Sequence, residues 1–439
     1  MYLKRNIDNS LIDWKISDQR KPLLLRGARQ VGKTSTVRNL AKSFSGYIEI
    51  NFDERPEFSQ IFETSTSVES ICEKISVLTS KSIVEGETLL FLDEIQSCIP
   101  AISMLRYFYE KKPRLHVIAA GSLLEFALAE IPSFGVGRIR SIFMYPLSYS
   151  EFLSAMDEDS LRSFLSNSDI GKPIAEPIHK KAIELYKKFI VIGGMPEAIM
   201  AYVTKNDILE VQHVINDLVI SFQTDFVKYK NRVPSARLRE VYDSIGMQMG
   251  SKFSYSYPNA TLNNAQIKDA IELLKMAGLV VPVTHTAAKG IPLGAEINPK
   301  KTKYLILDTG ILQRIMGLNI SDLLLSDHFD TINKGSIAEL HVGLELIKMQ
   351  NPMESVSLYY WQREAKNSQA EVDYVIQNYS KIIPVEVKAA TKGSMQSLFL
   401  FLKEKNLYQG VRFSLENFGQ YDKILSIPLY AIDAIKKLR

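Results

Sequence analysis

Short apolar runs alternate with segments of helical periodicity over roughly the first third of the chain. The runs have the length and the β-branched or aromatic content of buried strands, and they cover residues 23–25, 47–52, 88–92 and 115–120. Helices are expected between or after these runs, at residues 34–42, 68–78 and 123–129. Strands that alternate with helices predict an α/β domain with a parallel sheet.

The pattern changes twice after this region. From Glu151 to about Tyr229, apolar residues recur at three-to-four spacing, which predicts a helical segment. Residues 233–318 combine two amphipathic helices with a strand, a loop and a returning strand, a pattern similar to a winged helix. Residues 326–439 contain a helix and strands with period-two alternation, which predicts a second α/β domain.

Composition limits the class of protein further. Hydrophobic residues make up 46% and charged residues 23%, and no segment has the roughly 18 uninterrupted apolar residues of a membrane helix. The first residues lack a secretory apolar core, and Cys72 and Cys98 provide neither a disulfide framework nor a zinc site. We therefore expect a cytoplasmic protein without a membrane partner. The net charge of +4 permits nucleic-acid binding without indicating it.

A glycine-rich motif follows the first apolar run. Residues 27–34 fit the P-loop pattern G-x-x-x-x-G-K-[ST] at every fixed position. In such a loop, backbone N–H groups surround the phosphates, Lys33 contacts the β- and γ-phosphates, and the Thr34 hydroxyl binds Mg²⁺. The sequence therefore predicts binding of ATP and Mg²⁺ by Gly27, Ala28, Arg29, Gln30, Val31, Gly32, Lys33, Thr34 and Ser35.

Two acidic residues end the apolar run at 88–92. Asp93 and Glu94 are expected at the carboxyl end of a buried parallel strand, where open α/β sheets bind their ligands. In this Walker B arrangement, Asp93 holds Mg²⁺ and Glu94 polarises the attacking water. The alternative is that both acids cap the strand at a surface turn.

Three further residues are candidates for the nucleotide site, each with an alternative. Ser122 is a candidate γ-phosphate sensor, or the cap of the next helix. Arg138 is a candidate arginine finger, ahead of Arg140, although surface arginines are common. The glycine-proline corner at 193–196 ends one helix and starts the next. Its functional interpretation places Pro196 on the adenine face.

The winged-helix-like region carries a weak nucleic-acid signal. Charges on the polar face of its second helix, at 264–277, cancel one another, which makes groove binding by this helix doubtful. The following hairpin loop is better suited to phosphate contacts, because it carries Lys289, Lys300, Lys301 and Lys303. The alternative is a solvated loop.

Charged residues of the last region fall on strand faces. Period-two alternation places Asp373 on one strand face, and Glu386 together with Lys388 on a face of the next strand. Two carboxylates can hold Mg²⁺, and a nearby lysine can orient or deprotonate water for phosphodiester cleavage. This spacing predicts a nuclease-like site in which Asp373 and Glu386 bind the metal, with Glu339 approaching from a helix. The alternative is a salt-bridge ladder.

These motifs carry a family resemblance over nearly the whole chain. GARQVGKT, LLFLDEI, GRIRSIFMYPLSYSEF and GGMPEA resemble the prokaryotic AAA-type ATPases of the AAA+ superfamily that carry a C-terminal domain of unknown function. PKKTKYLILDTGIL and GSIAEL…EVDYVI…PVEVKAAT are similar to that family's winged-helix end and its PD-(D/E)xK restriction-endonuclease-like domain. The resemblance implies ATP and Mg²⁺ roles for Lys33, Thr34, Asp93 and Glu94, a first-sensor role for Ser122, an adenine contact for Pro196, and the nuclease motif for Glu339, Asp373, Glu386 and Lys388.

The expected fold class is α/β with four domains. They are an AAA+ P-loop core at 1–155, a helical lid at 156–230, a winged-helix domain at 231–325 and a restriction-endonuclease-like domain at 326–439. The expected function is ATP hydrolysis with Mg²⁺, coupled to a module that binds or processes DNA. The alternative is a nucleotide-dependent switch whose nuclease-like domain is a non-catalytic binding platform. Nuclease activity and assembly into a homo-oligomer are left open.

Overall fold

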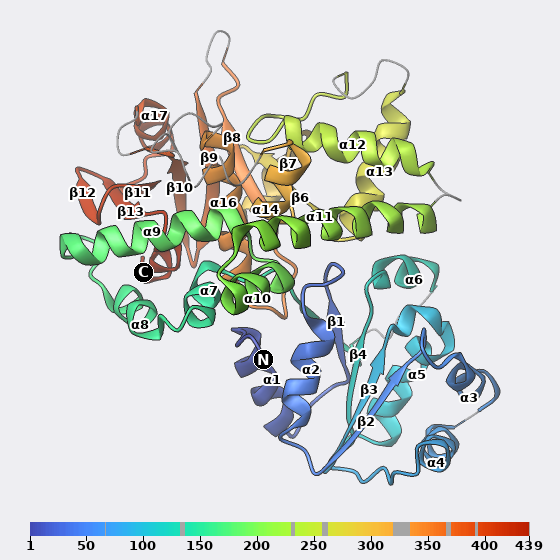
Figure 1. Cartoon of the computed structure of the whole chain (residues 1–439). Coiled ribbons are helices and arrows are strands. Elements are labelled where there is room, and N and C mark those ends of the chain that lie inside the picture. Colours follow the sequence, from blue (N-terminus) through green and yellow to red (C-terminus); the bar gives the residue numbers. More distant parts are fainter. Residues whose placement is uncertain are drawn as a thin grey trace. The chain divides into compact units, whose positions relative to one another are not determined.

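The computed structural model describes residues 1–65, 67–131, 137–229, 233–256, 262–318, 334–365, 370–390 and 394–438. The chain forms two compact units (Figure 1). The first comprises Met1–Pro146, Met276–Gly278 and Asn351–Ser355, and the second comprises Leu147–Lys275, Leu279–Gln350 and Val356–Arg439. Within the described ranges, no helix combines the length and the apolar character that crossing a membrane requires.

A parallel sheet of five strands forms the centre of the first unit. The strands lie in the order β2–β3–β4–β1–β5 and all run parallel. They are β1 (Leu23–Arg26), β2 (Gly46–Asn51), β3 (Thr88–Asp93), β4 (His116–Ala120) and β5 (Arg140–Phe143). Both β3 and β4 are buried along their whole length, which explains their uninterrupted apolar sequences. The predicted α/β class with a parallel P-loop core is confirmed.

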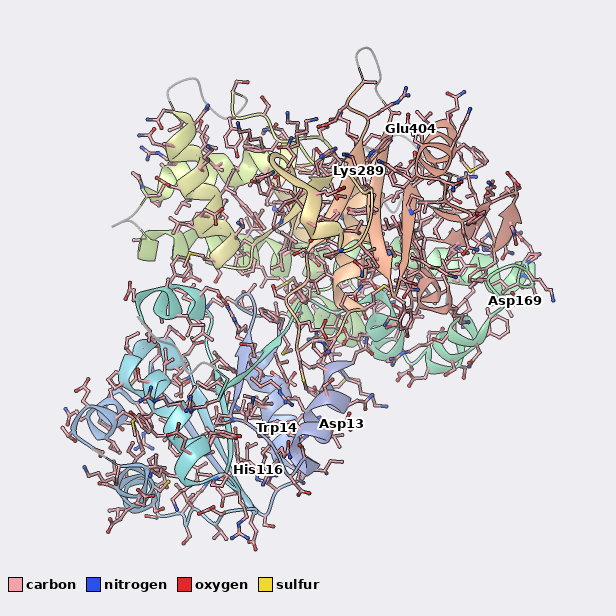
Figure 2. All side chains as sticks on the ribbon, turned by 180° about the vertical axis from the view of Figure 1, so that it is seen from behind. Asp13, Trp14, His116, Asp169, Lys289 and Glu404 are labelled. Atoms are coloured by element: carbon pink, nitrogen blue, oxygen red, sulfur yellow. The ribbon has the colours of Figure 1, made fainter. Side chains whose placement is uncertain are left out.

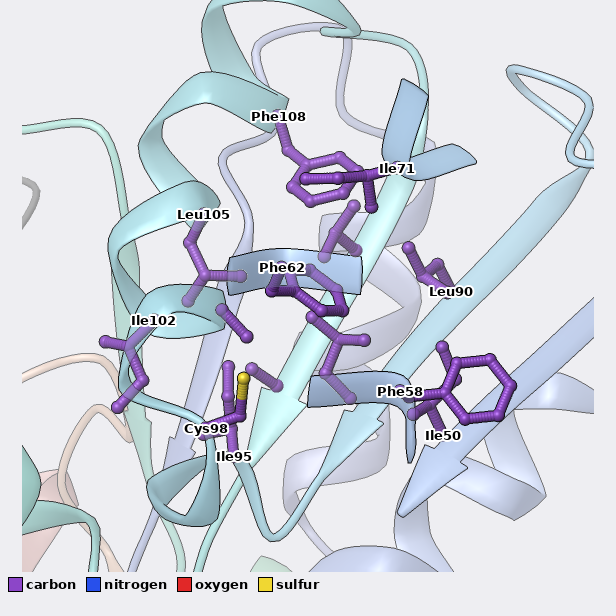
Figure 3. Packing of buried hydrophobic residues seen from close by; sticks show 14 of the residues in the cluster. Ile50, Phe58, Phe62, Ile71, Leu90, Ile95, Cys98, Ile102, Leu105 and Phe108 are labelled. Atoms are coloured by element: carbon purple, nitrogen blue, oxygen red, sulfur yellow. The ribbon is translucent and has the colours of Figure 1, made fainter. Parts of the chain in front are cut away.

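Helices of the first unit pack apolar residues onto this sheet. The helices are α1 (Ile7–Ile16), α2 (Lys33–Ala41), α3 (Ser59–Thr64), α4 (Val68–Thr79), α5 (Ile99–Lys111) and α6 (Leu124–Glu130). Figure 3 shows Phe62 of α3, Ile71 of α4 and Leu105 of α5 gathered over Ile50 and Leu90 of the sheet. Burial of each such side chain contributes roughly 2 kcal/mol. This core fixes the end of β3, where the Walker B acids lie.

Trp14 of α1 packs against His116, the first residue of β4 (Figure 2). Their ring centroids lie 5.6 Å apart, edge to face, and the Phe44 ring lies 4.7 Å from the imidazole. His116 Nε2 is 3.1 Å from the Lys15 carbonyl oxygen, so Nε2 carries the hydrogen and donates it. Nδ1 is buried without a hydrogen-bond partner in the described part of the chain. Burial lowers the pKa of His116 to about 4.

The second unit contains a mixed sheet of eight strands, in the order β12–β13–β11–β10–β9–β8–β6–β7. The strands are β6 (Val280–Thr286), β7 (Ile297–Ile306), β8 (Leu358–Gln362), β9 (Glu371–Asn378), β10 (Lys381–Val387), β11 (Gly410–Ser414), β12 (Gly419–Tyr421) and β13 (Ile424–Pro428). The β6–β7 hairpin comes from the predicted winged-helix region. It joins the strands of the last predicted domain, because β6 pairs parallel with β8. One continuous sheet therefore crosses the expected boundary.

The helices of the second unit include the helical segment that the sequence predicts from Glu151 to about Tyr229. They are α7 (Tyr149–Ala155), α8 (Asp159–Asn167), α9 (Glu176–Ile192), α10 (Pro196–Lys205), α11 (Ile208–Asp225), α12 (Ser235–Met247), α13 (Asn264–Met276), α14 (Thr309–Ile315), α16 (Lys334–Lys348) and α17 (Gln396–Glu404). The last residue of α13 falls in the first unit. The predicted breaks at 230/231 and 325/326 both lie outside the described residues and stay predictions.

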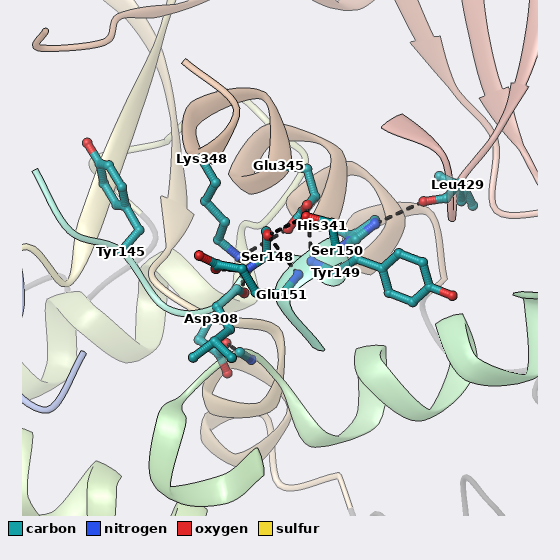
Figure 4. A network of polar contacts seen from close by, with 12 residues as sticks. Tyr145, Ser148, Tyr149, Ser150, Glu151, Asp308, His341, Glu345, Lys348 and Leu429 are labelled. Atoms are coloured by element: carbon teal, nitrogen blue, oxygen red, sulfur yellow. Dashed lines mark hydrogen bonds and ion pairs between the residues drawn. The ribbon is translucent and has the colours of Figure 1, made fainter. Parts of the chain in front are cut away.

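A buried polar network anchors the start of the second unit to α16 (Figure 4). The Tyr149 N–H donates to Glu345 over 3.2 Å, and Lys348 donates to the Leu147 carbonyl over 2.9 Å. Lys348 also pairs with Glu345 at 3.2 Å. Burial raises the pKa of Glu345 to about 7, and the Lys348 charge opposes this shift. The PLSYSEF segment thus has a structural role in packing.

Candidate nucleotide-binding site and acidic cluster

The loop between β1 and α2 has a backbone that two of its glycines make possible. Gly27 has φ +141°, and a Cβ atom there would lie 2.1 Å from the backbone oxygen of Met144. Gly32 has φ +98° and precedes the first turn of α2. Only glycine takes such angles without strain. The fixed glycines of the motif therefore have a physical reason in this fold.

Lys33 is the first residue of α2, and its side chain points into the loop that precedes the helix. Its ammonium donates to the carbonyl oxygens of Gly27 at 2.9 Å and Ala28 at 2.8 Å, and the residue is only 7% exposed. Burial lowers the pKa of Lys33 to about 8, although Glu94 and Asp93 oppose this shift. A protonated ammonium thus lies within the loop, held by groups that a phosphate can replace.

Thr34 and Asp93 meet across the space between α2 and β3. The Thr34 hydroxyl donates to Asp93 Oδ2 over 2.8 Å, and Asp93 is 3% exposed. Burial raises the pKa of Asp93 to about 6, against the hydrogen bond from Thr34. One hydroxyl and one carboxylate in contact are oxygen donors of the kind that Mg²⁺ prefers. These residues therefore fit the predicted Mg²⁺ position.

Glu94 follows β3 in a left-handed backbone conformation, with φ +47°. Its Oε2 accepts hydrogen bonds from Gln96 Nε2 at 2.6 Å and from the Ser122 hydroxyl at 3.1 Å. Ser122 does not cap α6, whose N-cap residue is Leu123. Sequence reasoning missed Gln96, although it stands only two residues after Glu94. The strand end thus holds three polar side chains in contact.

Arg138 and Arg140 lie in or next to β5. The Arg138 guanidinium pairs with Glu110 of α5 and is about half exposed. Arg140 is partly exposed. An arginine-finger role for either residue stays a prediction.

The corner at 193–196 has a structural explanation within the second unit. The Gly194 N–H donates to Asp308 Oδ2 over 2.6 Å, and a Cβ at Gly193 would lie 2.1 Å from Asp308 Oδ1. Pro196 is the first residue of α10, as the helix-start interpretation predicts. Its adenine contact stays a prediction.

Lys303, which was expected in the hairpin loop, lies among the predicted nuclease residues of the second unit. Lys303 Nζ lies 2.9 Å from Glu339 Oε1 and 2.6 Å from Glu371 Oε1, and its side chain is 1% exposed. The expectation that Lys303 is part of a phosphate-binding loop is wrong. The returning strand β7 begins at Ile297, so the lysine lies within this strand and not in the loop. We name Lys303, Glu339, Glu371, Asp373, Glu386 and Lys388 the acidic cluster.

The rest of the acidic cluster is also paired. Lys388 Nζ lies 2.6 Å from Glu386 Oε1, as the salt-bridge alternative requires. Asp373 Oδ2 accepts the Val387 N–H at 2.7 Å. The other oxygen of Glu386, Oε2, is buried and has no hydrogen-bond partner among the described residues. Every expected metal ligand thus has at least one oxygen engaged by the protein itself.

Neighbouring carboxylates keep the buried Lys303 side chain protonated. Burial alone would lower the pKa of Lys303, but the carboxylates of Glu339 and Glu371, with Asp373, outweigh it and raise this pKa above its usual value. Burial and then Asp373 raise the pKa of Glu386 to about 7. In the described residues, no three His, Cys, Asp or Glu side chains are arranged to hold a metal ion. The expected Mg²⁺ does not fit the cluster in this arrangement.

The comparisons with known proteins support the predicted ATPase class of the first unit and assign no function to the second unit. Residues 19–153 match a family model described as an AAA domain. Together with the loop geometry, this match defines an AAA-type P-loop domain. Residues 183–322 and 334–431 match two models of domains of unknown function, DUF8612 and DUF4143. Neither description supports the predicted winged-helix or restriction-endonuclease-like type. No curated protein matches the chain.

Solved structures show only distant likeness. A Walker-type ATPase of Pyrococcus abyssi is 15% identical with a TM-score of 0.46, over 72% of this chain and 96% of that one. The ORC1 protein of Aeropyrum pernix in complex with DNA is 14% identical with a TM-score of 0.27, over 73% and 92%. Drosophila ORC bound to DNA is 16% identical with a TM-score of 0.27, over 71% and 85%. These scores are too low to carry an argument about function.

Proposed function

We propose that the first unit binds ATP with Mg²⁺ and hydrolyses it. The observation that carries this proposal is the contact of Thr34 with Asp93 at 2.8 Å, with Glu94 as the next residue. Mg²⁺ bound there would neutralise charge on the β- and γ-phosphates. Glu94 then lies where a carboxylate can accept a proton from the attacking water.

Lys33 supplies the positive charge of the proposed site. In the nucleotide-bound state its ammonium exchanges the carbonyls of Gly27 and Ala28 for phosphate oxygens. Charge-assisted bonds to phosphate are stronger than bonds to carbonyl oxygens, so the exchange favours binding. The loop is therefore arranged for phosphate before nucleotide arrives.

Glu94 has to leave its present partners before it can act on water. Gln96 and Ser122 both donate to Oε2, which is one of its two basic oxygens. The Ser122 hydroxyl can donate to a γ-phosphate oxygen instead, which would remove one of these two hydrogen bonds to Glu94. This exchange supports Ser122 as the sensor of bound nucleotide.

Two variants test the nucleotide site. Lys33→Ala is expected to abolish ATP binding, because the ammonium contacts ground-state phosphates. Glu94→Gln is expected to keep ATP binding and to lose hydrolysis, because Glu94 acts only on the water. Binding of a fluorescent ATP analogue and release of phosphate separate the two effects. Turnover by Glu94→Gln at the wild-type rate would refute the assignment.

We further propose that nucleotide state controls a nucleic-acid-binding function of the second unit. The motivating feature is the exposed pair Lys289 and Lys300 of the hairpin, which can contact phosphates. DNA is the expected partner, and a cytoplasmic location stays the accompanying expectation. ATPase rates measured with and without DNA test this coupling. An unchanged rate, together with no DNA retention by the ATP-bound Glu94→Gln protein, would exclude it.

A further inference from the structure

We infer that the Lys303 ammonium takes the position of the divalent cation in the acidic cluster, so that the nuclease-like centre is closed to metal. Lys303 lies between Glu339 and Glu371 at 2.9 and 2.6 Å, and Glu339 is one of the Mg²⁺ ligands that the sequence predicts. Its side chain is 1% exposed, so water does not screen this charge. This inference is independent of ATP hydrolysis by the first unit.

The contribution of the β6–β7 hairpin makes this arrangement part of the fold. Lys303 pairs across the hairpin with Val283 of β6, and β6 pairs with β8. The backbone of Lys303 therefore lies in a paired strand and not in a loop. The Tyr360 ring of β8 lies beneath the ammonium, with its centroid 5.0 Å away. The backbone of Lys303 cannot shift without breaking hydrogen bonds of the sheet, and its ammonium is held by Glu339, Glu371 and the Tyr360 ring.

One oxygen of each remaining carboxylate ligand is already engaged by the protein. Glu386 is held by Lys388 at 2.6 Å, and Asp373 accepts the Val387 N–H at 2.7 Å. A divalent ion would need these oxygens within about 2.0–2.6 Å, where it would also repel the Lys303 charge. Metal and Lys303 therefore exclude each other. A closed centre favours the interpretation of the C-terminal region as a binding platform without nuclease activity.

The inference predicts that removing the lysine opens a metal site. Lys303→Met keeps most of the length of the unbranched side chain and removes its charge. Mn²⁺ is the probe, because the electron paramagnetic resonance signal of free Mn²⁺ falls on binding. The full-length chain carries Asp93→Asn throughout, which removes the metal ligand of the nucleotide site. Lys301→Met is the matched control, since Lys301 lies on the same strand and pairs with the more exposed Glu364.

Lys303→Met is expected to bind about one Mn²⁺ at least tenfold more tightly than the parent protein, because one buried positive charge is lost. The added change Asp373→Asn should abolish this binding, and Lys301→Met should bind as the parent does. A second variant keeps the test valid if Lys303→Met does not fold. Lys303→Met with Glu339→Gln removes both members of a buried pair, and circular dichroism reports whether it folds. It retains three carboxylates and should also bind.

Two outcomes overturn the inference. In the first, the parent protein with Lys303 in place binds Mn²⁺ tightly, and Asp373→Asn removes that binding. In the second, a folded Lys303 variant binds no more Mn²⁺ than the parent. Either result would mean that the ammonium does not occupy a cation position, whatever the ATPase assays of the first unit show.

Discussion

Acidification is expected to destabilise the first unit through one buried side chain, His116. Its pKa is about 4 in the folded chain and 6.5 when unperturbed. Between these values the unfolded chain binds more protons than the folded chain, so the stability contributed by neutral His116 is complete above pH 6.5 and is lost as the pH falls towards 4. The cause is structural. A proton on Nδ1 would place a charge between the Trp14 and Phe44 rings, without an acceptor in the described residues.

The loss of stability can be worked out from the difference between the two pKa values of His116. One pKa unit corresponds to 1.36 kcal/mol, so the linkage predicts a loss of about 2 kcal/mol at pH 5 and about 3 kcal/mol at pH 4. The charges of Arg20 and Lys15 act in the same direction as burial. A loss of this size is a large part of the stability of a typical domain.

Trp14 provides a local assay. The chain has two tryptophans, so Trp361→Phe leaves Trp14 as the single tryptophan, and its selectively excited emission reports unfolding of the first unit. Urea titrations at pH 7 and pH 5 compare this protein with a His116→Gln variant, whose amide donates a hydrogen bond and does not titrate. The free energy of unfolding should fall by about 2 kcal/mol more in the parent than in the variant.

Other groups that titrate between pH 7 and pH 5 contribute equally to both proteins, so the difference isolates His116. Equal pH dependence of parent and variant would refute the reasoning. A variant that loses more stability than the parent between pH 7 and pH 5 would refute even the sign.

Two further predictions concern the nucleotide site. Gly27→Ala should cost at least about 2 kcal/mol of stability and abolish ATP binding, because its Cβ would meet the Met144 backbone at 2.1 Å. The control is Gly86→Ala: Gly86 has φ +88°, and an added Cβ there would have no neighbouring atom within 4 Å. It should cost only about 1 kcal/mol of stability. Equal losses of stability in the two variants would contradict a role for the clash with Met144. If Arg138 serves a neighbouring copy, mixing Arg138→Ala with Glu94→Gln chains should restore part of the phosphate release. A wild-type rate per chain that is constant down to the dilute monomer would rule this out.

The nucleotide site was predictable because its chemistry lies in short segments. A P-loop needs a fixed spacing of glycines and lysine, and the run ending at Asp93 places an acid at a strand end by local pattern alone. The contact of Thr34 with Asp93 then follows from the packing of α2 against the carboxyl end of β3. Gln96 was missed because the left-handed turn at Glu94, which brings it back to the carboxylate, has no signature in residue type.

The acidic cluster was predictable only in part. Period-two alternation identified Asp373, Glu386 and Lys388, because strand faces are a local property. The position of Lys303 depends on which strands pair, and its partners Glu339 and Glu371 lie far along the chain. Lysine-rich segments are usually solvated, so residue type pointed the wrong way. Strand pairing over long distances is set by the whole sheet and leaves little trace in the sequence.

The pairing of β6 with β8 also bears on how the chain can be cut. A fragment that begins at α16 would match the model for residues 334–431, yet it would lose β6 and expose the edge of β8. That edge presents unpaired backbone groups beside the apolar side chains of Leu358, Tyr360 and Trp361. Open edges of this kind recruit strands from other molecules and lead to aggregation. We therefore expect a fragment cut at the boundary of the family model to aggregate, and a fragment that keeps the β6–β7 hairpin to be more soluble.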